Sequence, residues 1–313
     1  MSVIDFLKNE SILSVSQFRR ADLESVFAVA SGMSDIMSLP GGSLASLHNK
    51  VLVNLFYEPS TRTSSSFEAA MIRLGGKVIS INEVHYSSVS KGELLPDTVR
   101  TLGCYADAIV LRHPVKGAAA MATMYSRKPI INAGDGSGEH PTQAILDLYT
   151  ITQEAGEVDG LNITFCGDLR YGRTVHSLVK LLTLYDVHVN LVSPASLKLP
   201  DDIIKELNEK GMRISVHTEL DEVIDEADVL YVTRVQKERF DDLILYEKVK
   251  GTYVITPEVM GKAKGDMVLM HPFPRVGEIS MAVDSDPRAA YFRQMQYGLY
   301  VRMALLSMVM RDR

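Results

Sequence analysis

The sequence has little cysteine and no surplus of basic residues. Only Cys104 and Cys166 occur in 313 residues, without a CxxC spacing, which argues against a disulfide framework or a cysteine-based metal site. Both stand among apolar neighbours, and this context predicts small buried core residues. The 33 Lys and Arg are outnumbered by 39 Asp and Glu, giving a net charge of −6. This balance is the opposite of what nucleic-acid binding favours.

Long hydrophobic runs are also missing. The most apolar run, 299–310, contains Arg302 and is shorter than the roughly 18 to 20 residues that a membrane-spanning helix needs. The first residues carry Asp5 and Glu10 in place of a basic segment with an apolar core, so we expect no secretory signal and a cytoplasmic location. At about 150 residues per domain, the length predicts roughly two domains.

Short β-branched apolar runs alternate with helical patterns, which predicts an α/β fold with parallel sheets covered on both faces. The predicted strands cover 51–56, 77–81, 108–111, 129–132, 162–166, 187–192, 212–216, 229–233 and 267–270. The predicted helices cover 17–31 (with Ser16 as N-cap), 64–74, 141–152, 174–184 and 289–310. The acidic, glycine-containing stretch 154–160 is the predicted domain junction. In the last helix, the spacing of Tyr297, Val301, Leu305 and Met308 indicates core packing.

Ser60-Thr61-Arg62-Thr63 lies between the first predicted strand and the helix that follows. The free N–H groups and positive dipole end of a helix N-terminus suit a phosphate, and a guanidinium can bind two of its oxygens. Hydroxyl residues at this place can also be ordinary helix caps. Because Arg62 adds a charge that capping does not need, the motif favours an anion site.

Polar residues follow two further strands of the first half. Arg112 follows the strand at 108–111, and in open parallel sheets ligands bind beyond the carboxyl ends of strands. By itself, this position fits an ordinary surface arginine equally well. The segment 134–138 has three alternating glycines, which permit positive φ angles and close backbone approach. Pro141 suits the first position of a helix, so His140 and Gln143 are expected at its N-terminus.

Three motifs follow strands of the second half. The segment 167–174 is similar to a phosphate-binding P-loop, but Arg173 replaces the lysine and the intervening residues are bulky, which disfavours an NTPase. Arg234 follows the strand at 229–233. The segment 271–275, His-Pro-Phe-Pro-Arg, predicts a rigid turn whose carbonyls can accept hydrogen bonds. A dehydrogenase is disfavoured because Glu139 breaks the Gly-x-Gly-x-x-Gly pattern.

Four of these arginines follow strands in an acidic protein, and together they predict an anion site. They are Arg62, Arg112, Arg173 and Arg234. Surface charges that are merely solvated would not concentrate at strand ends.

The motifs 60–63 (leading into Ser66-Phe67-Glu68), Arg112-His113-Pro114 and His140-Pro141-Thr142-Gln143 resemble, in this order, the carbamoyl-phosphate signature of the aspartate and ornithine carbamoyltransferases. Thr142 and the His-Pro-Phe-Pro sequence at 271–274 favour the aspartate branch, as does Arg234-Val235-Gln236. The resemblance covers essentially the whole chain. It implies two doubly wound parallel-sheet domains, with a C-terminal helix returning to the first.

The resemblance also implies the domain roles and the reaction. Residues 1–150 with 290–313 would bind carbamoyl phosphate, and 151–289 would bind aspartate. The carbamoyl group would pass to the amine of L-aspartate, giving N-carbamoyl-L-aspartate and phosphate in the committed step of pyrimidine synthesis. No cofactor or metal is expected. The amine attack creates an oxyanion, and the leaving phosphate can take up the amine proton, so we assign no general base.

The resemblance implies roles for particular residues. Those expected to be catalytic are Arg62, Thr63, Lys91, Arg112 and His140. Those expected to bind carbamoyl phosphate are Ser60, Thr61, Arg62, Thr63, Ser87, Arg112, His140, Gln143, Pro272, Phe273 and Pro274. Those expected to bind aspartate are Lys91, Arg173, Arg234 and Gln236. Within this set, Thr63, Arg112 and His140 would polarise the carbamoyl carbonyl, while Gln143 and the carbonyls of Pro272 and Phe273 would hold its amino group.

The loop with Ser87 and Lys91 resembles one that enters a neighbouring subunit's site, which implies a homotrimer with shared active sites. A separate regulatory chain is left open, and neither nucleic acid nor a membrane is expected as a partner. Glu58 is expected to pair with Arg173 and Arg239 across the domain gap. The sequence departs from the family's common pattern at Ser90 and Gly277. The alternatives are a carbamoyltransferase for ornithine or a related amine, and a non-catalytic subunit that only binds carbamoyl phosphate.

Overall fold

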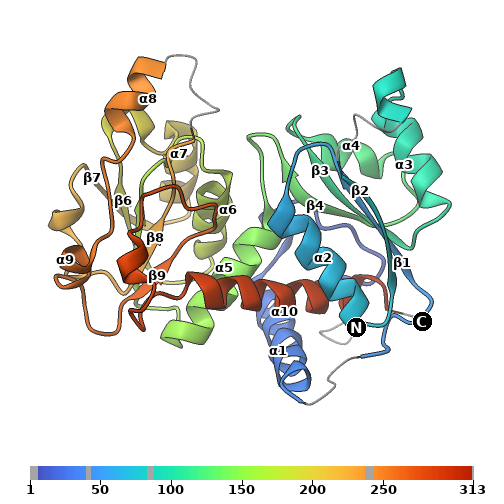
Figure 1. Ribbon diagram of the computed structural model, residues 1–313, viewed down its shortest axis with the longest axis horizontal. Coiled ribbons are helices and arrows are strands. Elements are labelled where there is room, and N and C mark those ends of the chain that lie inside the picture. Colours follow the sequence, from blue (N-terminus) through green and yellow to red (C-terminus); the bar gives the residue numbers. More distant parts are fainter. Residues whose placement is uncertain (1–5, 40–43, 83–87, 237–242, 312–313) are drawn as a thin grey trace. The chain divides into compact units, whose positions relative to one another are not determined.

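The computed structural model describes residues 6–39, 44–82, 88–236 and 243–311. The chain divides into two compact units, one formed by Met1–Leu146 with Gln296–Arg313 and the other by Asp147–Met295. Figure 1 shows strands and helices in each of them. Within the described ranges, no helix is both long enough and apolar enough to cross a membrane.

The first unit contains a four-stranded parallel sheet. Its strands are β1 (Val51–Phe56), β2 (Lys77–Asn82), β3 (Ala108–His113) and β4 (Ile130–Asp135). They lie in the order β2-β1-β3-β4, with Phe56 opposite Arg112 at the carboxyl ends of β1 and β3. The helices around it are α1 (Arg20–Met37), α2 (Thr61–Arg73), α3 (Leu95–Gly103) and α4 (Ala118–Thr123). The apolar runs of β1, β3 and β4 are buried, whereas β2 is an exposed edge strand.

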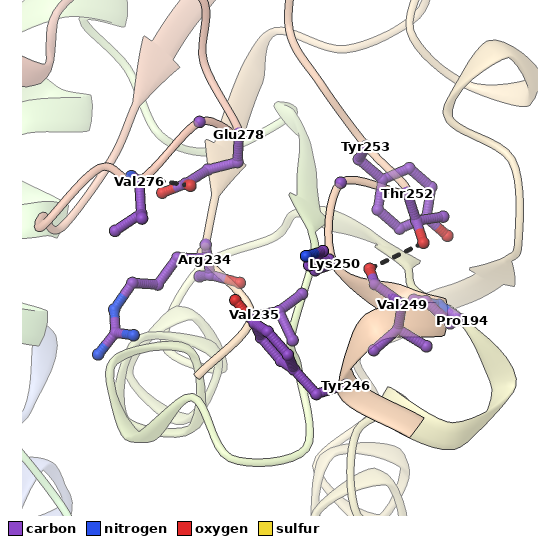
Figure 2. Close-up of a pocket in the computed structure, with 14 residues that line it drawn as sticks. Pro194, Arg234, Val235, Tyr246, Val249, Lys250, Thr252, Tyr253, Val276 and Glu278 are labelled. Carbon is purple, nitrogen blue, oxygen red and sulfur yellow. Dashed lines mark hydrogen bonds between the residues drawn. The ribbon is translucent and has the colours of Figure 1, made fainter. Parts of the chain in front are cut away.

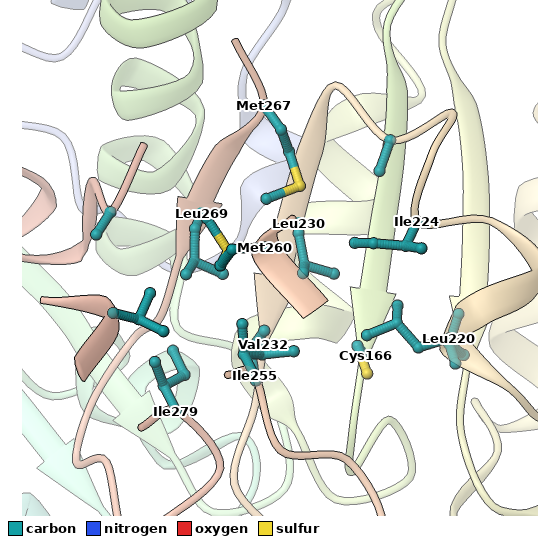
Figure 3. Close-up of a cluster of buried hydrophobic side chains, with 14 of the residues drawn as sticks. Cys166, Leu220, Ile224, Leu230, Val232, Ile255, Met260, Met267, Leu269 and Ile279 are labelled. Atoms are coloured by element: carbon teal, nitrogen blue, oxygen red, sulfur yellow. The ribbon is translucent and has the colours of Figure 1, made fainter. Parts of the chain in front are cut away.

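The second unit contains a five-stranded parallel sheet. Its strands are β5 (Asn162–Cys166), β6 (His188–Val192), β7 (Arg213–His217), β8 (Val229–Val232) and β9 (Val268–Met270), in the order β7-β6-β5-β8-β9. Its helices are α6 (Arg173–Leu182), α7 (Asp201–Glu209), α8 (Leu243–Val249) and α9 (Pro257–Met260). Figure 3 shows a buried cluster in which Cys166, Leu230 and Leu269 from the strands lie with Ile255 and Met260.

Two longer helices belong to both units. The unit boundary falls inside α5 (Pro141–Ala155) and again inside α10 (Tyr291–Val309). The end of α10 therefore returns to the first unit, as expected. Its residues Val301 and Leu305 are fully buried and Met308 is 2% exposed, which confirms their interpretation as core residues, whereas Tyr297 is only half-buried.

The strand orders place a topological switch point in each sheet. From β1 the chain adds β2 on one side and then β3 on the other, so the switch lies between β1 and β3. In the second sheet it adds β6 and β7 on one side of β5 and then β8 on the other, so the switch lies between β5 and β8. Crevices beyond the carboxyl ends of strands at such points are where open α/β sheets bind ligands. The parallel sheets predicted from the alternating pattern are confirmed.

Several details of the sequence-based prediction were wrong. Cys104 is exposed, because it caps the end of α3 beside the solvent, although Cys166 is buried as expected. Ser16 does not cap α1. It lies in the 3-10 turn Val15–Gln17. After two extended residues, Phe18 and Arg19, the helix begins at Arg20, where the Asp22 carboxylate accepts a hydrogen bond from the backbone N–H of Arg19. Arg112 belongs to the end of β3 rather than to the following loop.

Candidate active site

The N-terminus of α2 lies beyond the carboxyl end of β1, beside the first switch point. Ser60 is the N-cap residue, but its side chain makes no capping hydrogen bond. Its Oγ instead accepts a hydrogen bond from Nη1 of Arg112, at 3.3 Å. The first N–H groups of a helix have no partner within that helix, so this terminus presents donors and the positive dipole end. Ser60 thus does not act as an ordinary cap.

Arg112 is held between two side chains. Besides its contact with Ser60, its Nε lies 3.3 Å from Oε2 of Glu58, and both side chains are largely buried, at 17% and 26% exposed. The expected pairing of Glu58 with Arg173 and Arg239 remains a prediction. Arg173 belongs to the other unit, and Arg239 lies outside the described residues.

The segments that follow β3 and β4 are in direct contact. Gly136 has a φ angle of 53°, and a Cβ atom at this position would lie 2.2 Å from the carbonyl oxygen of Pro114. Only glycine permits this approach. After it, His140 is 3% exposed and its carbonyl accepts the N–H of Gln143, so both residues stand at the start of α5 as predicted. Of the carbamoyl-phosphate residues predicted in this unit, those that the structure describes therefore lie at the carboxyl-end side of its sheet.

Two loops at the second switch point are joined by a buried carboxylate. Asp168 is fully buried and accepts hydrogen bonds from the backbone N–H of Tyr171 at 3.0 Å and of Gln236 at 3.4 Å. The side-chain amide of Gln236 donates in turn to the carbonyl of Tyr171, at 3.1 Å. These bonds fix the loop that leads into Arg173, the first residue of α6, against the loop that carries Arg234.

Sequence reasoning missed this role of Asp168. Burial raises its pKa above the ordinary value, although the backbone N–H groups of Tyr171, Gln236 and Arg170 and the charge of Arg234 act in the opposite direction. The only signal in the sequence was an acidic residue after a glycine at the end of β5. Gly167 itself has a φ of 121°, and a Cβ there would lie 2.2 Å from the carbonyl oxygen of Thr233, so the two loops meet closely.

A cavity of about 570 Å³ opens beside these loops. Figure 2 shows Arg234, Tyr246, Lys250 and Glu278 among the side chains that line it. Two cations and one carboxylate are therefore among the residues around a space at the carboxyl ends of β5 and β8, and in Figure 2 the side chain of Arg234 extends away from Lys250 and Tyr246.

The predicted Pro272-Phe273-Pro274 turn follows β9 in the same unit. Phe273 has a φ of 55°, and its ring packs against Tyr291 and Phe292 at centroid distances of 5.8 and 5.5 Å. The turn is thus anchored on the first residues of α10.

Two predicted residues lie in the loop between β2 and α3. Lys91 is exposed at the end of the 3-10 turn Ser88–Lys91, and Ser87 lies outside the described residues. Their roles remain predictions.

Comparison with known proteins agrees with this arrangement. Residues 10–153 match the family model "Aspartate/ornithine carbamoyltransferase, carbamoyl-P binding domain", and residues 159–309 match "Aspartate/ornithine carbamoyltransferase, Asp/Orn binding domain". The chain belongs to the aspartate/ornithine carbamoyltransferase family.

Within this family, the chain is similar to aspartate carbamoyltransferase catalytic subunits and to a segment of longer multifunctional proteins. The catalytic subunit from Thermoplasma acidophilum is 50% identical over 98% of this chain and 100% of its own length. The multifunctional protein pyr1-3 of Dictyostelium discoideum is 55% identical over 97% of this chain, which spans only 14% of that protein. The structure of aspartate transcarbamoylase from Trypanosoma cruzi in complex with carbamoyl phosphate has a TM-score of 0.93 and 48% identity, covering 98% of this chain and 97% of that one.

Proposed function

We propose that this chain transfers the carbamoyl group of carbamoyl phosphate to the amine of L-aspartate, giving N-carbamoyl-L-aspartate and phosphate. The observation that carries the proposal is the placement of anion-binding groups at both switch points, with Arg112 and the start of α2 at one and Arg234 at the other. Related trypanosomal structures contain carbamoyl phosphate with aspartate, or carbamoyl aspartate with phosphate. The reaction makes a precursor of pyrimidines.

The first unit binds carbamoyl phosphate. The phosphate lies on the start of α2, where Ser60, Thr61, Arg62 and Thr63 supply hydroxyls, backbone donors and a guanidinium, and Arg112 adds a second cation. Since Ser60 Oγ is not used for capping, it is available to the phosphate together with the arginine that contacts it.

The second unit binds aspartate through Arg173, Arg234 and Gln236. Asp168 fixes the loops of these residues to one another, which reduces the ordering that binding would otherwise require. The two substrates together carry about four negative charges, and a unit ion pair at 4 Å is worth about 4 kcal/mol at an effective dielectric near 20, before desolvation. Holding two anions together against their repulsion is therefore the main task of the site.

The chemical step needs donors rather than a covalent intermediate. Attack by the amine puts negative charge on the carbamoyl oxygen, where Thr63, Arg112 and His140 donate hydrogen bonds, each good donor being worth roughly 3 to 4 kcal/mol. Gln143 and the carbonyls of Pro272 and Phe273 hold the amino group. The departing phosphate takes up the amine proton.

The assembly completes the site. Ser87 and Lys91 act in the active site of a neighbouring copy, so the working form is a homotrimer in the cytoplasm. The first unit is the carbamoyl-phosphate domain, corresponding to about 1–150 with 290–313, and residues 151–289 form the aspartate domain. A separate regulatory chain is compatible with this arrangement but not required by it.

The deciding experiment is a colorimetric assay of carbamoylated product with aspartate and ornithine side by side, on protein whose mass is measured by light scattering. We expect product from aspartate alone and the mass of a trimer. Product from ornithine alone would assign the chain to the other branch. Binding of carbamoyl phosphate without product from either amine would indicate a non-catalytic subunit.

A further inference from the structure

A buried histidine and a carboxylate hold the backbone of the turn after β9. His271 is 1% exposed, and its Nδ1 accepts a hydrogen bond from the backbone N–H of Phe273 at 2.8 Å. Its Nε2 lies 2.6 Å from Oε1 of Glu278, whose side chain is 12% exposed. The other carboxylate oxygen, Oε2, accepts the backbone N–H of Val276 at 3.0 Å. Both ends of the turn are therefore fixed by one pair of side chains.

The contacts determine which nitrogen of His271 carries the proton. Because Nδ1 accepts the N–H of Phe273, it has no proton of its own, so the proton of the neutral ring lies on Nε2 and is donated to Glu278. Burial alone would raise the pKa of Glu278, but the hydrogen bonds from His271 and from backbone N–H groups hold that pKa below its ordinary value. An ionised Glu278 thus keeps His271 in the tautomer that accepts from Phe273.

Phe273 needs such a constraint. Its φ of 55° lies in the left-handed region, which is unfavourable for a residue other than glycine. A conformation of this kind persists only where its surroundings impose it. Here the N–H of Phe273 is fixed by His271 while the ring is fixed against α10. The direction of the neighbouring carbonyls depends on this backbone conformation.

The backbone of His271 is anchored separately in the interior. Its N–H donates to Oε1 of Gln294 at 3.0 Å, and the amide of Gln294 donates to Oδ1 of Asp147 at 2.6 Å. The hydroxyl of Tyr231 donates to Oδ2 of Asp147 at 2.7 Å, and all three of these partner side chains are fully buried. The imidazole therefore projects from a rigid base.

We propose that the His271–Glu278 pair positions the carbonyls of Pro272 and Phe273, and that this pair thereby sets the preference of the site for a carbamoyl over an acetyl group. This inference rests on the proposed function, in which these carbonyls accept the carbamoyl N–H groups. An acetyl group has a methyl in place of the amino group and cannot donate. Discrimination between the two thus depends on well-directed carbonyls, since a hydrogen-bonding site rejects an analogue that leaves its acceptors unpaired.

The test is Glu278→Gln, which keeps the size of the side chain but replaces one acceptor with a donor. If the amide oxygen faces His271, the NH₂ group opposes the N–H of Val276. If the amide oxygen faces Val276, the NH₂ group faces His271 and needs Nε2 as its acceptor. The ring proton must then move to Nδ1, which breaks the hydrogen bond from the N–H of Phe273. Neither orientation satisfies all three partners.

The measurement is the ratio of the KM of carbamoyl phosphate to the inhibition constant of acetyl phosphate, together with inhibition by inorganic phosphate. In Glu278→Gln we expect the preference for carbamoyl phosphate over acetyl phosphate, measured by this ratio, to weaken about tenfold, which is the effect of one lost hydrogen bond. The inhibition constant of inorganic phosphate should stay within about twofold of that of the unmodified protein. The matched control is Glu222→Gln, because Glu222 Oε2 also contacts a histidine of the same unit, His217 Nδ1, at 2.9 Å. The control variant should show the same ratio as the unmodified protein.

Other outcomes distinguish the two proposals. An unchanged ratio in a folded, active Glu278→Gln variant would overturn the positioning role and leave the proposed reaction intact. Failure of the unmodified protein to form carbamoyl aspartate would overturn the reaction itself. Should the variant not fold, ¹⁵N NMR of the unmodified protein decides, because the proposal requires the Nε2-protonated tautomer of His271 and the Nδ1-protonated tautomer would contradict it.

Discussion

Replacing Arg112 by lysine tests whether the arginine acts through its geometry or only through its charge. The guanidinium reaches two partners at once, with Nε 3.3 Å from Oε2 of Glu58 and Nη1 3.3 Å from Oγ of Ser60. A lysine ammonium carries the same charge at a single point and cannot keep both contacts while also meeting a phosphate oxygen. At about 1.5 to 3 kcal/mol for a hydrogen bond to a charged group, one lost contact corresponds to a fall of roughly 10- to 150-fold.

The assay is formation of carbamoyl aspartate at saturating aspartate with carbamoyl phosphate varied. We expect kcat/KM for carbamoyl phosphate to fall by this factor in Arg112→Lys, with little change in melting temperature. The control is Arg100→Lys in the same unit; the Arg100 side chain is 60% exposed and its Nη1 lies 3.9 Å from Oδ1 of Asp97. Activity of Arg112→Lys equal to that of the control would refute the geometric role of the arginine.

Three further changes test other parts of the account. Arg234→Ala should raise the KM of aspartate by roughly 10- to 150-fold while inhibition by inorganic phosphate is unchanged, because the arginine assigned to the aspartate carboxylate is removed. Equal losses for both ligands would contradict this role. Mixing equal amounts of the inactive variants Lys91→Ala and Arg62→Ala should restore activity through hybrid trimers. If each site takes Arg62 from one chain and Lys91 from its neighbour, random mixing gives about a quarter of the sites both intact residues. No recovery after verified subunit exchange would count against shared sites. Tyr231→Phe should lower the free energy of unfolding, measured in denaturant, by about 1 to 3 kcal/mol, because it removes a buried hydrogen bond to Asp147. Burial and the charge of Asp147 raise the pKa of Tyr231 well above its ordinary value, so its hydroxyl stays protonated and donates to that carboxylate. An unchanged unfolding midpoint would show that this bond contributes nothing.

The arrangement of strands could be predicted because each is a short apolar run buried in a parallel sheet. Strands β1 and β5 begin and end where the sequence indicated, at Val51–Phe56 and Asn162–Cys166. The ends of β3 and β4 extend further than predicted, since Arg112 and Asp135 continue the ladder although neither is apolar. The start of α1 was missed because the Ser16 hydroxyl resembles a cap, whereas Ser14 and Gln17 close a local turn there.

The residues of the site could be predicted more readily than the contacts that hold them. Arginines that follow strands, hydroxyls at a helix start and the family resemblance all identify positions along the chain. They do not show that Ser60 Oγ contacts Arg112, that Asp168 joins two loops, or that Glu278 fixes the tautomer of His271. The first two of these contacts join residues far apart in sequence, and all three depend on backbone geometry that no local pattern encodes.

The central claim is that both switch points serve one bisubstrate anion. The most direct measurement is calorimetric titration of the protein with N-(phosphonacetyl)-L-aspartic acid, a compound present in a related trypanosomal structure. The account predicts binding of one molecule per chain, with Arg62→Ala and Arg234→Ala each weakening the affinity by at least tenfold although the two residues belong to different units. No measurable heat and no rise in melting temperature, or a loss confined to one of the two variants, would contradict it.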